Sequence, residues 1–260
     1  MVYVKSKREL DIMREAGRRL STILSRLASL ARPGMTLIEL DREAERLTLE
    51  ADSKPAFKGY HGFRHTLCTS VNEQVVHGIP SDRKLVEGDI VGIDYGLVYQ
   101  GFYSDSAVTV PIGNVSAEAK KLMKVTASSL YAAIEASQSG NTLKDLARAV
   151  EGVIKPHGYG IVREFVGHGI GQKLHEDPQI PNYEAGASLV KLRPGMTIAI
   201  EPMVNVGTHE VKVLSDRWTA VTVDGKLSAH FEHSIAITEN GPEILTDWED
   251  DGFRKVAGLI

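Results

Sequence analysis

Two aspartates, Asp94 and Asp105, stand in β-branched and aromatic runs that predict the two strands of a β-hairpin. A two-residue loop of Tyr99 and Gln100 would place the carboxylates directly opposite each other, whereas a loop of Gln100 and Gly101 would place them diagonally on one face. Acids so close among apolar neighbours must share a proton, face water or bind a cation. Because hard divalent cations prefer oxygen ligands, a metal site is the sharpest of these interpretations.

The segments around this hairpin predict helices and strands that recur in the same order. An N-cap Ser or Thr followed three residues later by an acid predicts three helix starts, at Ser6 with Glu9, Thr36 with Glu39 and Thr142 with Asp145. Apolar residues at helical spacing extend the first two helices, and another helix is expected from about residue 116. Short strands are expected at 67–71 and 74–77.

The two halves of the chain align at a nearly constant offset. Residues 34–40 match residues 140–146, and residues 88–94 match residues 195–201, which places Asp94 on Glu201. Asp105 falls on Glu232 if the second half carries an insertion near 205–218, which we expect to form a loop. A chance match of common strand patterns is the alternative, and the constant offset disfavours it. The sequence thus predicts one domain, 1–260, with an internal repeat of about 6–113 and 114–240.

Neither half could bury its apolar face alone, so we expect them to associate about a pseudo-twofold axis. The predicted fold is α+β, with an antiparallel sheet in the middle backed by two helix pairs. Asp94, Asp105, Glu201 and Glu232 would then converge near the axis. Since divalent cations commonly compensate such repulsion, this arrangement favours a two-metal site.

A Gly-rich segment adds imidazoles to this acidic set. His168 lies between Gly167 and Gly169, and His175 follows seven residues later. A single His is usually a satisfied core or surface residue, but beside four acids His168 would supply a nitrogen ligand. The oxygen-dominated set without thiolate suits two divalent ions per chain, drawn from Co, Mn, Fe(II), Zn or Ni.

Two ions at such a site would acidify a shared water and hold a carbonyl, which indicates hydrolysis, most simply of an amide. We expect Glu201 to act as proton shuttle as well as ligand, because a carboxylate beside that water can take its proton and return it to the leaving amine. His77 and His175 are candidates to hydrogen-bond the scissile amide. For His77, a plain strand-end residue is the alternative interpretation.

Composition limits the classes of protein that the chain can be. With 260 residues, 42% hydrophobic and 25% charged, it can bury a full core, and a net charge of −4 argues against a general nucleic-acid binder. The single cysteine, Cys68, excludes an intrachain disulfide and fits a reducing cytosol. No secretory leader or membrane-spanning run is recognisable. We therefore expect a cytoplasmic protein that makes no membrane contact and acts as a monomer.

An ordered set of motifs resembles type I methionine aminopeptidases over essentially the whole chain. Each motif would be weak alone, but the ordered set is specific; it comprises Lys54-Pro55-Ala56-Phe57-Lys58-Gly59-Tyr60, Ser70-Val71-Asn72-Glu73, His77-Gly78-Ile79-Pro80, Gly88-Asp89-Ile90, Gly167-His168-Gly169-Ile170-Gly171, His175-Glu176, Glu201-Pro202-Met203 and Phe231-Glu232-His233. The chain is most similar to the bacterial type, since it shows neither the extended N-terminal region of eukaryotic members nor the long insertion of type II enzymes.

The resemblance implies the pita-bread fold and a dinuclear site in which Asp105 and Glu232 bridge the ions. It also implies the reaction, removal of the initiator methionine when the next residue is small, and it makes nascent polypeptides the expected partners, with transient ribosome contact left open. By position, His77 and His175 match the family's substrate-contacting histidines. Contacts to the methionine and its surroundings are expected from Tyr60, His61, Phe63, Cys68, Leu174 and Trp218, whose walls suit a thioether. Leu174 departs from the family pattern, which commonly has Phe there.

Two rival interpretations share much of this evidence. A proline-directed pita-bread peptidase would use the same metal ligands, but such proteins normally carry an additional N-terminal domain. A pita-bread module that has lost its metals and binds peptides or ribosomes would be non-enzymatic, and the five filled ligand positions disfavour it.

Overall fold

The computed structural model describes residues 2–248. Its helices are α1 (Lys7–Leu30), α2 (Leu37–Glu50), α3 (Ala117–Ala136) and α4 (Leu143–Ile154), with short 3₁₀ turns at Tyr60–Gly62, Lys155–His157 and Glu184–Gly186. Its strands are β1 (Lys54–Pro55), β2 (Leu67–Val71), β3 (Gln74–Val76), β4 (Ile90–Tyr99), β5 (Phe102–Pro111), β6 (Gly160–Ile161), β7 (Gly167–Gly169), β8 (Glu176–Ile180), β9 (Thr197–Ile200), β10 (Met203–Asn205), β11 (Val211–Val213), β12 (Ala220–Thr222), β13 (Ser228–His230), β14 (Glu232–Thr238) and β15 (Gly241–Ile244).

The predicted capping boxes set the start of three helices. At α2, the backbone N–H of Thr36 donates to Glu39 Oε2 at 2.8 Å, and the Glu39 N–H donates to the Thr36 hydroxyl at 3.2 Å. The same reciprocal pattern opens α1 and α4, as the sequence predicted. Each cap satisfies backbone donors that the first helical turn leaves unpaired.

Within residues 2–248 the main sheet has the strand order β1-β4-β5-β14-β9-β7-β8, with β2 also paired to β4 and β15 to β14. The β4–β5 hairpin turns at Gln100 and Gly101, whose φ angles are +48° and +84°. Positive φ at both loop residues is typical of the tight turn that matches strand twist. Asp94 therefore pairs with Ala107 rather than with Asp105, which confirms the diagonal of the two predicted registers.

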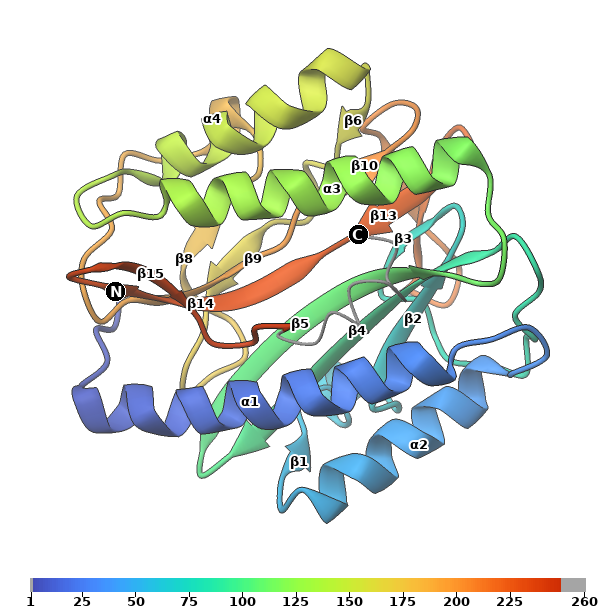
Figure 1. Cartoon of the computed structure of the whole chain (residues 1–260), viewed down its shortest axis with the longest axis horizontal. Coiled ribbons are helices and arrows are strands. Elements are labelled where there is room, and N and C mark those ends of the chain that lie inside the picture. The colour runs from blue at the N-terminus through green and yellow to red at the C-terminus, as the bar shows by residue number, and fades with distance from the viewer. Residues whose placement is uncertain (1, 249–260) are drawn as a thin grey trace.

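The two halves of the chain meet where β5 pairs antiparallel with β14, through Ala107 with Glu232 and Ser106 with His233. Each half contributes one helix pair, and Figure 1 shows both pairs in front of the curved sheet. The predicted α+β fold, an antiparallel sheet backed by two helix pairs, is confirmed. The single domain and the internal repeat of its halves stay predictions.

The two faces of β4 have different surroundings. Tyr95, fully buried, brings its hydroxyl to 2.7 Å from the Thr48 hydroxyl on α2, so this face packs against the helices. Because successive side chains of a strand alternate, Asp94 points to the opposite face. The helix layer and the apolar core beneath it thus leave the acidic residues on the side of the sheet away from the helices.

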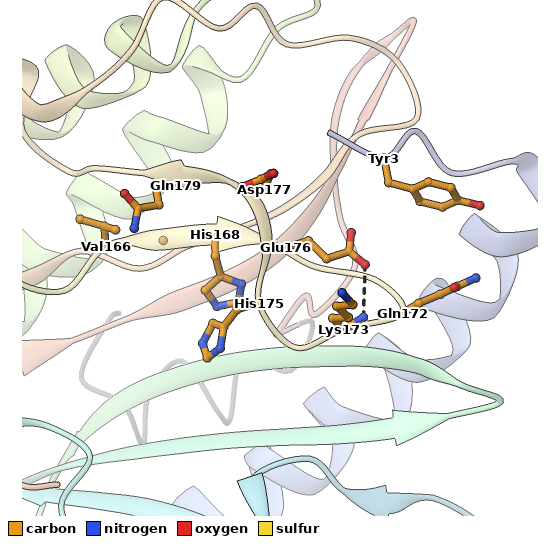
Figure 2. A pocket seen from close by; sticks show the side chains of 10 residues that line it. Tyr3, Val166, His168, Gln172, Lys173, His175, Glu176, Asp177 and Gln179 are labelled. Atoms are coloured by element: carbon orange, nitrogen blue, oxygen red, sulfur yellow. Dashed lines mark hydrogen bonds between the residues drawn. The ribbon is translucent and has the colours of Figure 1, made fainter. Parts of the chain in front are cut away.

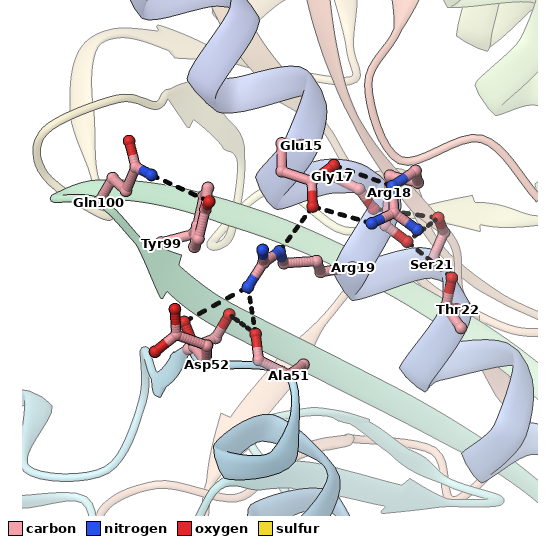
Figure 3. A network of polar contacts seen from close by, with 11 residues as sticks. Glu15, Gly17, Arg18, Arg19, Ser21, Thr22, Ala51, Asp52, Tyr99 and Gln100 are labelled. Carbon is pink, nitrogen blue, oxygen red and sulfur yellow. Dashed lines mark hydrogen bonds and ion pairs between the residues drawn. The ribbon is translucent and has the colours of Figure 1, made fainter.

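Arg19 fastens α1 to the end of α2 and to the hairpin (Figure 3). Its guanidinium donates to the carbonyls of Ala51 and Asp52, donates through Nε to the Glu15 carboxylate at 2.8 Å, and lies 3.8 Å from the centre of the Tyr99 ring. A cation over an aromatic face adds attraction to these hydrogen bonds. The contacts hold the first helix pair against the turn end of β4 and β5.

One expectation about this fold is wrong. The insertion near 205–218 is not simply a loop, because Val211–Val213 forms β11, which pairs with β12, and β12 pairs with β3. Val211 and Val213 are β-branched residues that favour a strand once a partner is available. The turn between β11 and β12 carries Trp218. Among the described residues, no helix is long and apolar enough to cross a membrane.

Candidate metal centre and active site

Five neighbouring strands each place one predicted ligand at the centre of the sheet. Asp94 lies on β4, Asp105 on β5, Glu232 on β14, Glu201 directly after β9 and His168 on β7. Ala107 of β5 pairs with Asp94 on one side and with Glu232 on the other. Since paired residues and residues two apart along a strand share a face, Asp94, Asp105 and Glu232 lie on one face of the sheet.

Glycine on both sides lets His168 join this row. A Cβ at Gly167 would lie 2.3 Å from the Ala199 carbonyl oxygen, and one at Gly169 would lie 2.2 Å from that of Asp177. Only glycine therefore lets β7 approach its neighbouring strands so closely. His168 pairs with Ala199 of β9, two residues before Glu201, which brings the imidazole to the acids.

The distances fit metal ligation. Ligand atoms of Asp105, His168 and Glu232 lie within 4.8 Å of one another, and so do those of Glu201, His230 and Glu232. Glu232 belongs to both groups and thus lies between two potential ion positions. His168 Nε2 is 3.6 Å from one oxygen of Glu201, and His230 Nε2 is 3.6 Å from the other.

Buried polar atoms without a partner indicate that something is bound at this site. Within the part of the chain that the structure describes, no hydrogen-bond partner reaches Asp94 Oδ1, Asp105 Oδ1, Glu232 Oε1 or His230 Nε2. Native proteins rarely leave such atoms unpaired. An oxygen-rich set with imidazole and no thiolate suits divalent ions such as Mn, Fe(II), Co or Zn, so the residues present fit a metal centre.

Burial raises the pKa of all four carboxyl groups. The pKa of Asp94 rises to about 7, with the charge of Glu201 adding to the effect, and the pKa of Glu201 rises to about 8. The pKa values of Asp105 and Glu232 lie well above their ordinary range because of burial and the neighbouring carboxylates. Without a cation the cluster retains protons near neutral pH, and a bound cation would replace them.

The nearby histidines are neutral. Burial lowers the pKa of His168 to about 3 and that of His77 to about 4, and it also lowers those of His175 and His230. His168 Nδ1 lies 2.9 Å from the Gly169 carbonyl oxygen. Because a carbonyl can only accept, Nδ1 carries the proton and Nε2 presents its lone pair towards Glu201.

An apolar cavity of about 140 Å³ opens beside the ligands. Its walls contain all but one of the predicted site residues; it is lined by Phe57, Tyr60, Phe63, Cys68, His77, Asp94, Asp105, His168, Leu174, His175, Glu201, Trp218 and Glu232. The rings of Phe63 and Trp218 meet edge to face at 5.0 Å. Burial raises the pKa of the Cys68 thiol well above its usual value, so Cys68 acts as an uncharged wall.

Two histidines point into this cavity from different elements. His175 Nδ1 and the Tyr60 hydroxyl form a hydrogen bond of 2.6 Å. The centre of the His175 ring lies 4.4 Å from that of the His168 ring. His77 packs edge to face against Phe165 at 5.2 Å and has a φ of +59°. A non-glycine residue in this conformation is strained, and such strain is often found at functional sites.

The sequence prediction and the structure differ at three residues. His61 does not line the cavity; it is exposed and rests edge-on against the Tyr60 ring at 4.4 Å. His230 and Phe57 were missed as site residues. His230 could have been found from the alternation of strand side chains, because it precedes Glu232 by two residues.

A second, more polar depression of about 630 Å³ adjoins the cavity and shares His168 and His175 with it. Figure 2 shows these two rings beside the segment that carries Lys173 and Glu176, with Gln179 and Asp177 on β8. The reactive centre therefore opens from an apolar pocket on one side to a polar surface on the other.

Comparison with known proteins decides which family this architecture represents. The model of metallopeptidase family M24 matches residues 11–239. The chain belongs to metallopeptidase family M24. The M24 match also implies the divalent metals that the geometry accommodates.

Individual relatives narrow the family to its methionine aminopeptidases. Methionine aminopeptidase 1 of Bacillus subtilis is 50% identical over 246 residues, covering 95% of this chain and 99% of that protein. The crystal structure of methionine aminopeptidase from Thermotoga maritima matches with a TM-score of 0.92 and 45% identity, over 95% of this chain and 100% of that one. Prolidase from Pyrococcus furiosus matches at a TM-score of 0.77 and 26% identity, over only 66% of its length. The predicted pita-bread fold, the bacterial-type resemblance and the assignment to a metallo-exopeptidase class are confirmed.

Proposed function

We propose that this M24 chain removes N-terminal methionine from peptides and nascent proteins whose second residue is small, using two divalent ions per chain. The observation that carries the proposal is a cluster of buried carboxylates with unpaired oxygens that line one side of an apolar cavity. The similarity to bacterial methionine aminopeptidases supports the same activity.

Five residues would hold the ions: Asp94, Asp105, His168, Glu201 and Glu232, of which Glu232 belongs to both groups of neighbouring ligand atoms. Divalent ions at such a site lower the pKa of water and polarise a substrate carbonyl. Co, Mn, Fe(II), Zn and Ni are the candidate ions.

The chain's own groups then bind the substrate and move the proton. The methionine side chain enters the cavity between Phe63, Cys68 and Trp218, whose apolar and sulfur-containing walls suit a thioether. His77 and His175 hydrogen-bond the scissile amide, which both can do because burial keeps them neutral. Glu201 accepts a proton from the attacking water and returns it to the leaving amine, which it can do because a bound cation would keep its carboxyl group ionised.

We propose a peripheral place for His61 in substrate binding. His61 lies at the rim beside Tyr60, where it would touch substrate only outside the cavity. The substrates in the cell would be nascent polypeptides, so the reaction would take place in the cytoplasm. The protein would act as a monomer, and any contact with the ribosome would be transient.

The test is release of free methionine from Met-Ala-Ser and Met-Lys-Ser by metal-stripped protein, before and after Mn or Co is added. We expect metal-dependent release from the first peptide only. Cleavage of both peptides would remove the proposed restriction on the second residue. No release with any metal, from protein that remains folded, would favour a peptide-binding module over an enzyme.

A further inference from the structure

Lys5 is a buried charge far along the chain from the ligands. Its side chain is 1% exposed, and its Nζ lies 2.7 Å from Glu176 Oε2, whose side chain is 13% exposed. The centre of the Tyr3 ring lies 5.3 Å from this ammonium. The charge of Lys5 is therefore compensated chiefly by Glu176.

Glu176 directly follows His175 and helps to close the segment that presents it. The second carboxylate oxygen, Glu176 Oε1, accepts the backbone N–H of Lys173 at 3.2 Å, a contact drawn in Figure 2. The segment is also fixed at its start, where the Tyr103 N–H of β5 donates to the Gly171 carbonyl at 2.7 Å. Lys5 thus anchors the end of the segment that β5 does not hold.

The N-terminal segment is itself fixed to the strand that leads to Glu201. The backbone N–H of Lys5 donates to the Gly195 carbonyl at 2.7 Å, in the turn before β9. Close packing keeps Lys5 in this place, since a Cβ on Gly171 would lie 2.5 Å from Lys5 Cε and 2.8 Å from Glu176 Oε1. One residue therefore spans the turn before β9 and the segment before β8.

A buried ion pair is weak evidence of a contribution to stability, because well-packed uncharged residues of similar volume often stabilise a protein at least equally. The Lys5–Glu176 pair is better explained by the geometry that it fixes, since small displacements of a group that contacts the reacting amide reduce turnover strongly. We propose that Lys5 and Glu176 are positioning residues, which hold the 171–176 segment so that His175 faces the scissile amide. This inference rests on the proposed role of His175.

The test uses the full chain loaded with Mn²⁺, in the variants Lys5→Met, Glu176→Gln and the double variant. Thermal midpoint, kcat and KM for Met-Ala-Ser, and amide hydrogen exchange of residues 171–176 are measured in each. Arg14→Met is the matched control, because it breaks the Arg14–Glu243 ion pair of α1, which does not touch this segment.

Each single variant leaves a charge without its partner, so both should lose thermal stability, and the double variant should regain most of it. We expect kcat to fall about tenfold in all three variants, with KM changed less than twofold and with faster exchange in 171–176. The control should keep its kcat and the slow exchange of this segment. If the single variants do not fold, the double variant still provides every measurement.

Recovery of kcat together with thermal stability in the double variant would overturn the proposal, because the pair would then act on stability alone. Unchanged exchange in 171–176 would overturn it as well. If the parent protein releases no methionine, the proposed function fails, whereas hydrogen exchange still decides whether Lys5 fixes this segment.

Discussion

Metal-stripped protein should lose stability as the pH rises from 6.5 to 8. In the folded chain burial raises the pKa of the four carboxyl groups, so they keep protons that the unfolded chain has already released. A carboxyl group with a raised pKa contributes stability at low pH, and this contribution is lost as the pH rises towards the folded-state pKa. The expected slope is therefore downward.

The lower limit of this window is set by the histidines. Burial lowers the pKa values of His77, His168, His175 and His230 below the unfolded value of 6.5. These groups make the folded state more stable as the pH rises to about 6.5, opposite to the carboxyl groups. Above that pH the unfolded-state imidazoles lose their remaining protons and this opposing contribution fades, so that by about pH 7.5 the carboxyl groups alone determine the slope.

The expected magnitude can be taken from Glu201 alone. Its folded-state pKa is about 8, so the window covers roughly 1.5 pH units, each corresponding to about 1.36 kcal/mol. The free energy of unfolding should thus fall by about 2 kcal/mol. For a chain of this size that lowers the thermal midpoint by about 4 to 8 °C.

The assay is thermal unfolding of chelator-treated, dialysed protein at several pH values between 6.5 and 8. Protein loaded with Mn²⁺ should show little of this slope, because the ions replace the protons. Glu201→Gln should reduce the slope in the stripped protein, since it removes one titrating group. A midpoint that stays constant or rises with pH in stripped protein would refute the proposed protonation of the cluster.

Four substitutions test individual residues. Glu201→Ala should abolish turnover, because it removes a ligand and the proton shuttle; substantial remaining kcat in a steady-state assay would show the assignment wrong. His77→Ala should lower kcat while metal content, measured by atomic emission, is retained; loss of metal would make His77 a ligand. Trp218→Ala should raise KM for Met-Ala-Ser about tenfold by opening the cavity wall, and an unchanged KM would place the methionine elsewhere. Thr36→Ala should cost about 1 kcal/mol in denaturant unfolding with unchanged kcat, and a neutral effect would show that the cap is dispensable.

The features that are local in sequence could be predicted well. Capping pairs such as Thr36 with Glu39 act across three residues, and the hairpin needed only a turn and two strands. The alignment of the two halves predicted that Glu201 would lie near Asp94, and the structure brings both residues to the same cavity. The sequence could not choose between the two hairpin registers, since both loops satisfied the same pattern.

The features that depend on packing between distant segments could not be predicted. The alternation of side chains could have suggested His230, but its place in the site also depends on β5, where the Thr109 hydroxyl pairs with the His230 backbone across 121 residues of sequence. His61 was expected among the substrate contacts, yet it is exposed and has a φ of +47°. Lys5 was not among the predicted site residues, and only the folded chain brings it to Glu176 across 171 residues of sequence.

The most direct test of the central claim is a titration of metal-stripped protein with Mn²⁺ or Co²⁺ in which bound metal and released methionine are measured in the same sample. We predict that release from Met-Ala-Ser begins with metal binding and reaches its maximum by two ions per chain. Full release by protein without metal, or no release from folded protein that has bound both ions, would contradict a metal-dependent aminopeptidase at this site.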